Sequence, residues 1–299
     1  MKAALKRLRY SQPFNRVTTG GVRRFCRLIG TTPEIFPRHL HRVGDVLEPL
    51  PNGEQLRLFS KGDDWVTNQV FWKGWKAYEP GTIDLFYRLA GRADVVLDIG
   101  AYVGFFTLIA ALANRNARVF AFEPMEAIYR RLHENVELNG LKNVECFNAA
   151  VSDFDGHAQF FFSAAALREG LPTSSSLSES FMTGAPELKG VDVPLLTIDT
   201  FCQTHSVPRI DLVKIDTETT EPSVLRGMRR VLSRDRPAIV CEILRDRADT
   251  TAIDAELRPL GYKYFLLKPE GPELRQSIEG HPEFLNYLFT TNLDDAQVT

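Results

Sequence analysis

Several carboxylates follow two buried apolar stretches in the second half of the chain. Asp216 ends the stretch RIDLVKID, Glu218 and Glu221 come shortly after it, and Glu242 lies near the end of the stretch PAIVCEIL. The carboxyl ends of neighbouring parallel strands open onto one crevice, so we expect these acids to converge there. Crowded carboxylates raise one another's pKa, which suits one of them to act as a general base, and carboxylates also bind divalent cations. The alternative is a set of solvated acids at a helix start, one of them compensated by Lys214.

A second candidate site is the segment DIGAYVG, residues 98–104, which we expect to join a strand to a helix. Gly100 allows a tight turn, and Gly104 lets the helix start pack close to the sheet. Peptide N–H groups at such a helix start can meet an anion. Tyr102 stands where the dinucleotide fingerprint G-x-G-x-x-G has its second glycine, which admits a pyrophosphate. The segment therefore favours a nucleoside ligand without phosphates over NAD or FAD, although a strand–glycine–helix turn can also be plain architecture.

Glu123 ends the next predicted strand, VFAFEP, 23 residues after Gly100. An acid at this point can accept hydrogen bonds from both ribose hydroxyls of a nucleoside. Its alternative role is to stabilise the start of the following helix. A third strand leads to Asn148 and Ala150, where small residues leave room for a flat purine.

The elements that must position these residues follow an α/β pattern. Short apolar runs alternate with amphipathic stretches from residue 94 to 151, which predicts strands and helices in βαβαβ order and a parallel sheet. An extra strand is expected at 157–164, a polar loop at 167–190, and a helix from Glu221 to Ser233. Two strands at the end of the chain lack an intervening helix, which predicts an antiparallel pair closing the sheet. Nearer the start, strands are expected at 55–60 and 65–72, followed by a helix at 82–90.

We therefore divide the chain into four parts. Residues 1–43 form a basic N-terminal arm that is partly helical, and residues 44–90 supply strands and a helix packed on the core. Residues 91–292 form the catalytic domain, and residues 293–299 are expected to be a frayed tail. The polar loop at 167–190 is predicted to fold over the substrate as a lid, because long loops inside domains are usually functional or disordered.

Charge is distributed unevenly along the chain. The first 43 residues hold ten Lys or Arg and one acid, Glu34, whereas the remaining residues hold 26 bases and 37 acids. Such an arm is either simply solvated or contacts an anionic membrane surface or a nucleic acid. The acidic remainder has no basic stripe interleaved with aromatic residues, so no stable nucleic-acid partner is expected. The first residues lack the apolar core of a signal peptide. We expect a cytoplasmic protein, with the arm allowing peripheral contact with the membrane.

Composition narrows the class of protein. The 299 residues are 44% hydrophobic and 25% charged, which is a globular profile. Four scattered cysteines form no C-x-x-C pair, so neither a zinc ribbon nor a disulfide framework is predicted. No run of 18 apolar residues occurs, so no transmembrane helix is expected.

The sequence resembles the FkbM-type methyltransferases, a branch of the class I S-adenosylmethionine-dependent enzymes. The resemblance covers about residues 60–245 and rests on eight ordered motifs: YEP at 78–80, DIGAYVGFFT at 98–107, FEP at 122–124, LHENVELNGLKNV at 132–144, AVSDFDG at 150–156, LTIDTF at 196–201, KIDTETTEPSVLRG at 214–227 and PAIVCEIL at 237–244. Two positions depart from the family pattern, which usually has Asn in place of Tyr102 and Gly in place of Thr219.

The resemblance implies a Rossmann-like, seven-stranded, mostly parallel sheet with an antiparallel C-terminal strand pair and an N-terminal extension. It implies S-adenosylmethionine as the cofactor and the hydroxyl of a sugar, glycolipid or natural product as the methyl acceptor. The alternatives are an RNA-binding or RNA-modifying protein and a nicotinamide oxidoreductase. The oligomeric state is left open, and so is the need for a divalent cation. The candidate catalytic residues are Asp216, Glu218 and Glu242, and the candidate cofactor-binding residues are Glu79, Asp98, Gly100, Ala101, Tyr102, Gly104, Thr107, Glu123, Asn148 and Ala150.

Overall fold

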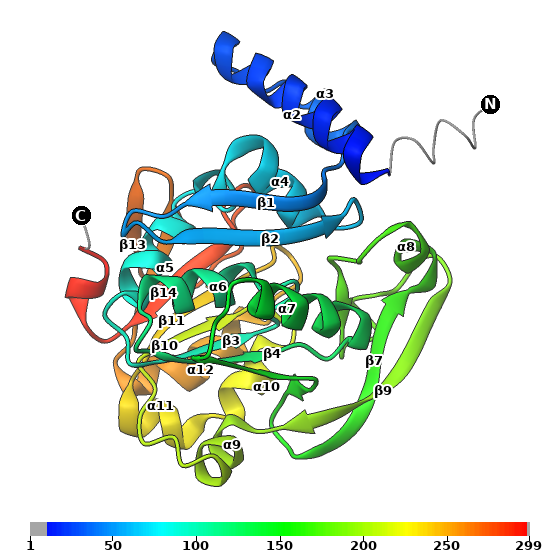
Figure 1. Ribbon diagram of the computed structural model, residues 1–299. Helices are drawn as coiled ribbons and strands as arrows, with labels where there is room; N and C mark the ends of the chain where they lie inside the picture. Colours follow the sequence, from blue (N-terminus) through cyan, green and yellow to red (C-terminus); the bar gives the residue numbers. More distant parts are fainter. Residues whose placement is uncertain (1–10, 298–299) are drawn as a thin grey trace.

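The computed structural model describes residues 11–297, and its centre is an eight-stranded sheet (Figure 1). The strand order is β13-β12-β14-β11-β10-β3-β4-β5. Five neighbouring strands are parallel: β3 (Val95–Ile99), β4 (Arg118–Phe122), β5 (Val144–Phe147), β10 (Leu212–Ile215) and β11 (Ala238–Glu242). Three antiparallel strands complete the sheet: β12 (Lys263–Lys268), β13 (Gly271–Arg275) and β14 (Asn286–Thr290).

The mostly parallel α/β sheet and its antiparallel C-terminal pair are confirmed, with one strand more than expected. The added strand is β13, which lies at the sheet edge and has the half-exposed sequence GPELR. Neither face of this edge strand is fully buried. Its sequence therefore lacks the alternation of apolar and polar residues from which a strand is predicted.

Helices cover both faces of the sheet. One face packs against α5 (Thr82–Ala90), α6 (Phe105–Ala113) and α7 (Glu126–Leu138). The other packs against α9 (Ile198–Thr204), α10 (Glu221–Arg226), α11 (Arg229–Asp235) and α12 (Thr250–Leu257). The single helix predicted over 221–233 is wrong, since α10 and α11 are separated at Gly227. The Gly227 carbonyl accepts a hydrogen bond of 3.0 Å from the Asp199 backbone N–H instead of continuing the helix. The Asp199 carboxylate accepts hydrogen bonds from the backbone N–H groups of Arg230 and Val231, which are the first turn of α11.

A separate four-stranded sheet stands beside the main one (Figure 1). It contains β6 (Ala150–Val151), β7 (Gly156–Ser163), β8 (Ser175–Ser176) and β9 (Leu188–Leu196), in the order β6-β9-β7-β8. The strand expected at 157–164 therefore exists, but it belongs to this second sheet. The short helix α8 (Ala164–Glu169) follows β7 and opens the segment predicted to be a lid.

The N-terminal part adds a further layer over α6 and α7. The hairpin β1 (Val43–Pro49) and β2 (Gln55–Lys61) packs there, and the side-chain carbonyls of Asn135 and Asn139 accept hydrogen bonds from the backbone of β2. The helices α2 (Gln12–Ile29) and α3 (Ile35–His39) precede this hairpin.

The strand predicted at 65–72 is wrong, because these residues form helix α4 (Trp65–Lys73). Its side chains are buried on nearly every face, so the sequence shows neither helical nor strand periodicity. The signal for a helix was the cap: the Asp64 carboxylate accepts a hydrogen bond of 2.7 Å from the backbone N–H of Thr67.

Short 3₁₀ helices complete the secondary structure at Trp75–Ala77, Arg258–Leu260 and Leu293–Asp295. The last of these lies within the segment expected to be a frayed tail, and its Asp295 accepts a hydrogen bond from the Thr290 hydroxyl at 2.5 Å. Residues 298–299 of that segment lie outside the described residues. The prediction that the chain does not start with a signal peptide concerns residues 1–10, which lie outside the described residues. Within 11–297, no helix combines the length and the apolar character needed to cross a membrane.

Candidate active site

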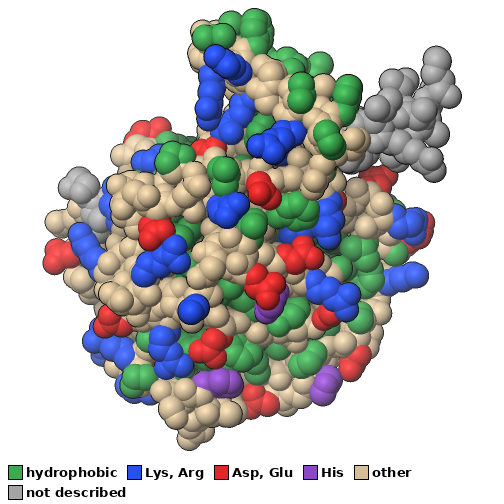
Figure 2. All heavy atoms as spheres, in the orientation of Figure 1, with side chains coloured by type: hydrophobic (Ala, Val, Ile, Leu, Met, Phe, Trp, Pro, Cys, Tyr) green, Lys and Arg blue, Asp and Glu red, His purple; other side chains and the backbone are tan. Residues whose placement is uncertain are grey.

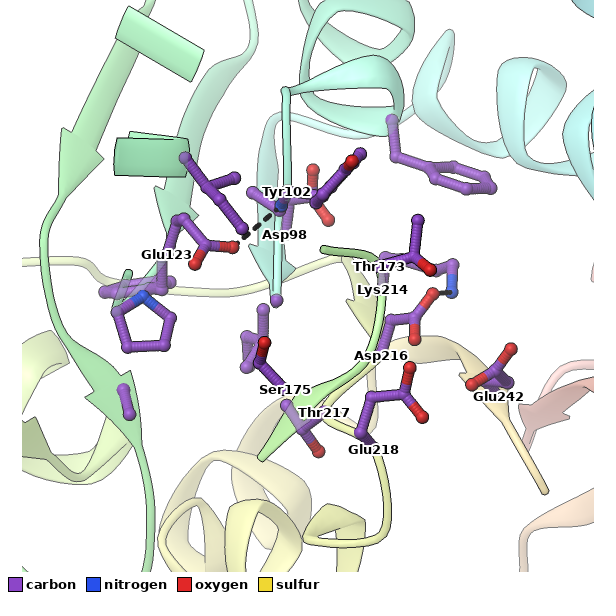
Figure 3. A pocket seen from close by; sticks show the side chains of 18 of the residues that line it. Asp98, Tyr102, Glu123, Thr173, Ser175, Lys214, Asp216, Thr217, Glu218 and Glu242 are labelled. Atoms are coloured by element: carbon purple, nitrogen blue, oxygen red, sulfur yellow. Dashed lines mark hydrogen bonds and ion pairs between the residues drawn. The ribbon is translucent and has the colours of Figure 1, made fainter. Parts of the chain in front are cut away.

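A pocket of about 440 Å³ opens at the carboxyl ends of β3, β4, β10 and β11. Parallel strands direct their carboxyl ends to one edge of a sheet, so residues far apart in sequence meet there. Most of the predicted site residues line the pocket: Glu79, Asp98, Gly100, Ala101, Tyr102, Glu123, Ala150, Asp216, Glu218 and Glu242. Gly104, Thr107 and Asn148 do not line it, and each supports a residue that does. Figure 3 shows Glu123 on one side, the cluster Asp216, Glu218 and Glu242 on the other, and Asp98 between them.

Glu123 is held firmly at the end of β4. It is only 5% exposed, and its two carboxylate oxygens accept hydrogen bonds from the backbone N–H groups of Tyr102 (3.0 Å) and Met125 (2.9 Å). The Asn148 side-chain amide donates to the backbone carbonyls of Glu123 and Pro124, which fixes the same turn. Burial raises the pKa of Glu123 to about 7. The carboxylate keeps lone pairs free for hydroxyl donors in the pocket.

The glycine turn between β3 and α6 has the tight geometry that its sequence predicted. Gly100 has a φ of 82°, and a Cβ there would lie 1.8 Å from the Asp216 carbonyl oxygen of the neighbouring strand. Gly104 has a φ of 90°, and a Cβ there would lie 2.6 Å from a methyl group of Leu132 on α7. Gly100 therefore requires glycine for conformation and for space, whereas Gly104 requires it for conformation, since the Leu132 side chain can move.

Asp98 lies at the centre of the pocket wall and is almost fully buried. Its Oδ2 accepts a hydrogen bond of 2.5 Å from the Thr107 hydroxyl on α6, which orients the carboxylate. Burial raises the pKa of Asp98 to about 6, although the Thr107 hydrogen bond and the Lys214 charge oppose this shift. A buried carboxylate of this kind is suited to bind a cationic group that enters the pocket.

Tyr102 occupies a position where the family pattern usually has Asn. Its φ is 50°, in the left-handed region that Asn tolerates better than most residues. A tyrosine there gives up some backbone energy but gains a hydrogen bond, because its hydroxyl donates to the Leu171 carbonyl at 2.9 Å. The same residue donates its backbone N–H to Glu123. Tyr102 thus ties the 167–190 segment directly to the turn that holds Glu123.

The carboxylate cluster is built around Lys214, a residue of β10 that is 1% exposed. Its ammonium donates to Asp216 at 3.0 Å and lies over the Phe106 ring. Burial alone would lower the pKa of Lys214, but the charges of Asp216, Glu79 and Glu242 outweigh it and hold that pKa above the usual value. The positive charge of Lys214 therefore partly neutralises several acids of the pocket at once.

Because these acids outnumber the cation, their own protonation is shifted. Burial and the neighbouring Asp216 raise the pKa of Glu79 to about 7, with Lys214 opposing the shift and Asn286 donating to Glu79 at 3.0 Å. Burial and Asp216 raise the pKa of Glu242 well above its usual value. Burial, Asp216 and Glu221 raise the pKa of Glu218 to about 8.

Glu218 sits on a strained turn between β10 and α10. It has a φ of 54° and is followed by Thr219 with a φ of 82°, a conformation that is costly for a β-branched residue. The turn is held by Glu221, whose Oε1 accepts hydrogen bonds from the Thr217 hydroxyl and from the Thr219 backbone N–H. Glycine, which the family usually has at position 219, would relieve this strain.

The 167–190 segment lies against the pocket and contributes Pro172, Thr173, Ser175 and Leu177 to its wall. The fully buried Ser176 donates its hydroxyl to the Glu218 carbonyl at 2.7 Å. The segment therefore contacts both ends of the site, through Tyr102 at one end and Glu218 at the other.

The sequence interpretation gave Lys214 only a minor, compensating role, although the structure places it at the centre of the cluster. The signal was available, since a lysine inside the buried apolar run LVKI must have anionic partners. Ser176 and Asn286 carried no sequence signal, because each acts through a contact between segments far apart in the chain. Within residues 11–297, no group of three or more His, Cys, Asp or Glu side chains is arranged to hold a metal ion.

The raised pKa values predict that the ligand-free protein loses stability as the pH rises from about 5 to about 8. Glu79, Asp98, Glu123 and Glu218 have folded-state pKa values of about 7, 6, 7 and 8, above those of the unfolded chain. In this window the folded protein binds more protons than the unfolded protein, so raising the pH favours unfolding. Thermal unfolding followed at several pH values would show a falling midpoint. A midpoint that rises over the same range would contradict these pKa shifts.

Comparison with known proteins gives one family match. The family model described as Methyltransferase FkbM domain matches residues 98–264. The 31-O-demethyl-FK506 methyltransferase FkbM of Streptomyces tacrolimicus is 28% identical over 209 residues, which are 62% of this chain and 77% of that protein. The hexuronic acid methyltransferase AglP of Haloferax volcanii is 29% identical over 154 residues, 52% of this chain and 58% of that protein. The AMB antimetabolite synthetase AmbE of Pseudomonas aeruginosa is 29% identical over 190 residues, 53% of this chain but only 9% of that protein. The chain thus spans less than two thirds of the length of AglP and of AmbE.

Proposed function

The chain belongs to the FkbM methyltransferase family, and from this premise we propose that it transfers a methyl group from S-adenosylmethionine to a hydroxyl group of a sugar, glycolipid or natural product. The observation that carries the proposal is the division of the pocket. A turn and a carboxylate suited to a nucleoside lie at one end, and a cluster of acids with raised pKa values lies at the other.

The residues of the pocket fit this cofactor. Glu123 offers carboxylate oxygens for ribose hydroxyls, and Ala149 and Ala150 leave room for a flat base beside it. Among the described residues that line the pocket, Lys214 is the single cation, and it is paired with Asp216. A pocket of this composition suits a ligand with positive groups and without phosphates. It gives no support to a nicotinamide dinucleotide, whose pyrophosphate would meet Asp98 and Tyr102.

When bound, S-adenosylmethionine supplies a methyl group attached to a positively charged sulfur. The residues of this chain would hold the nucleoside through Glu123 and receive the cationic amino acid end through Asp98 and Glu79. They would align the acceptor with the methyl group, which accounts for much of the rate of a displacement reaction. Glu218 would take the proton that the acceptor hydroxyl loses, with Asp216 and Lys214 fixing the charge around it.

An oxygen acceptor is supported by two observations. A hydroxyl needs a base when it becomes a nucleophile, and the pocket contains a carboxyl group with a pKa of about 8, suited to that role near neutral pH. Two relatives are named as methyltransferases of 31-O-demethyl-FK506 and of a hexuronic acid. A divalent cation could also activate a hydroxyl, and treatment with a chelator separates the two hypotheses.

The cofactor assignment predicts a defined binding result. In calorimetry the protein should bind S-adenosylhomocysteine in the micromolar range. Replacing Glu123 by Ala should weaken this binding by roughly 5-fold to 150-fold, because the ribose hydroxyls lose their partner. Glu126→Ala, a change at an exposed neighbour on α7, is the matched control. Tight binding of NADH together with no binding of S-adenosylhomocysteine would overturn the proposal.

The 167–190 segment predicts a separate effect on the acceptor end. Replacing Ser176 by Ala removes the hydrogen bond to the Glu218 carbonyl, so kcat should fall by about 5-fold to 10-fold. The affinity for S-adenosylhomocysteine should stay unchanged, because Ser176 is not among the residues that line the pocket. Ser174→Ala, at an exposed position of the same segment, should change neither value. Equal losses of kcat and of cofactor affinity for Ser176→Ala would mean that the segment acts only as scaffold.

A further inference from the structure

Helix α2 stands at the surface of the molecule, beyond the β1–β2 hairpin (Figure 1). Exposed hydrophobic side chains lie on this protruding part of the molecule (Figure 2). Phe14, Val17, Phe25 and Leu28 are 49%, 74%, 55% and 80% exposed. Their spacing places them on one side of the helix as an apolar stripe, since residues three, four, seven and eleven apart share a face. An exposed set of large apolar side chains on one face marks a contact site.

A basic surface borders this stripe. Arg16, Arg24 and Arg27 form no ion pair with any residue of 11–297, and α2 contains no acidic residue. With Arg42, Phe71 and Arg23, of which Arg23 is paired with the buried Glu48, they line a hollow of about 460 Å³. Positive groups gathered with so few counter-charges attract an anion such as a phosphate group.

The remaining face of α2 fixes the helix to the body of the protein. Asn15 donates to the His41 carbonyl at 2.8 Å and accepts from the Val43 backbone N–H at 2.8 Å. The Arg42 guanidinium donates to the Thr19 hydroxyl at 3.0 Å. The helix is therefore held by a polar face in a set orientation, and its apolar and basic surfaces both stay outside.

We propose that α2 is a membrane-surface helix that binds anionic phospholipid bilayers. In this arrangement Phe14, Val17, Phe25 and Leu28 enter the headgroup region, while the arginines contact lipid phosphates. Helices that lie in the plane of a membrane interface combine one apolar face with a strongly basic polar face, and α2 has both. The wider sequence around α2 also has the charge that attracts anionic lipids, because residues 1–43 hold ten bases and a single acid.

Other binding partners would account for only one of the two surfaces of α2, the apolar stripe or the arginines. A nucleic acid would match the arginines but would leave the apolar stripe in water. A second copy of the chain would cover the stripe, but a two-fold contact brings the same face of each copy together and so places like charges side by side. A lipid surface accounts for both surfaces at once. This inference does not depend on the methyl-transfer proposal.

The experiment is vesicle co-sedimentation of the full chain. The wild type should partition onto phosphatidylcholine vesicles containing about 30% phosphatidylglycerol, and only weakly onto phosphatidylcholine alone. F25E/L28E should lower the partition coefficient on the order of 100-fold by removing apolar contact. R16Q/R24Q/R27Q should lower it on the order of 100-fold by removing charge.

Matched controls carry the same changes elsewhere on the surface. F154E/L274E alters two exposed apolar residues. K142Q/R236Q/K263Q removes three exposed charges that form no ion pair with the described part of the chain. Both controls should bind vesicles like the wild type. Circular dichroism and thermal unfolding establish that every variant is folded.

Four results would overturn the proposal. The first is no binding of the wild type to the anionic vesicles, and the second is equal binding by the α2 variants and their controls. The third is a wild-type dimer that F25E/L28E converts to a monomer, which would assign the stripe to a second copy. The fourth is binding of inorganic phosphate or RNA through the arginines without any binding of vesicles.

Discussion

Replacing Glu218 by Gln is expected to lower kcat by roughly 10²-fold to 10⁴-fold, the usual contribution of a positioned proton acceptor. Glu218 lines the pocket, and burial with the nearby Asp216 and Glu221 raises its pKa to about 8. The amide keeps the shape of the side chain but cannot accept a proton. Affinity for S-adenosylhomocysteine should barely change, because Glu123, the residue proposed to bind the ribose, lies on the opposite side of the pocket.

The pH profile adds a signature that a structural role would not give. A base acts in its deprotonated form, so kcat/KM of the wild type should rise with pH and level off above about 8. The profile of kcat should lie at lower pH, because a bound cation favours the carboxylate form. Glu218→Gln should lose the rising limb in both profiles.

Several outcomes would contradict this assignment. Glu179→Gln, a change at an exposed acid of the neighbouring segment, is the control and should leave the rate unaltered. A chelator that abolishes activity, with recovery on adding Mg²⁺ or Mn²⁺, would assign the activation to a metal instead. If the triple variant D216N/E218Q/E242Q still methylates at a near wild-type rate, the acids are scaffold and alignment alone must explain catalysis.

The second large effect concerns stability and Lys214. Replacing Lys214 by Met should lower the free energy of unfolding by about 3–5 kcal/mol at pH 8, because breaking a buried ion pair leaves uncompensated charge. Lys214 is 1% exposed, and its ammonium interacts with Asp216, Glu79 and Glu242. Urea unfolding at equilibrium measures the change.

The pH dependence distinguishes charge from packing. As the pH falls from 8 to about 5, Glu79, Glu218 and Glu242 take up protons and the missing cation matters less, so the variant should approach the wild type. Lys142→Met, at an exposed position, is the control. A difference of less than about 1 kcal/mol at pH 8, or one that does not change with pH, would show that these acids do not depend on Lys214.

Much of the fold was predictable because its signals are local. The order of strand and helix from Val95 to Phe147 follows from apolar runs that alternate with amphipathic stretches, and the glycines of residues 98–104 mark the turn between β3 and α6. The pocket acids were predictable for a related reason. Glu123 and Asp216 directly follow β4 and β10, and Glu242 is the last residue of β11. Parallel strands bring such positions to one end of the sheet.

The errors arose where long-range contacts override local pattern. Helix α4 is buried on most sides, so its sequence lacks the periodicity that identifies a surface helix. The division of residues 221–233 into two helices depends on hydrogen bonds with Asp199, a residue of a different helix. The assignment of residues 156–163 to a second sheet likewise depends on pairing with β9.

The second sheet has a consequence for how this enzyme could diversify. The chain leaves the main sheet after β5 and returns to α9 through Val151 and Leu196, which are paired partners in β6 and β9. Neighbouring strands lie about 5 Å apart, so the excursion between these two residues begins and ends at nearly one point. A segment anchored in this way can be lengthened, shortened or exchanged without displacing β3 or β4, provided that its contacts with Tyr102 and Glu218 are kept. Residues 152–195 therefore form an insertion with closely spaced ends, and we expect grafts of this insertion between relatives to alter the pocket wall formed by Pro172, Thr173 and Ser175 rather than the main sheet.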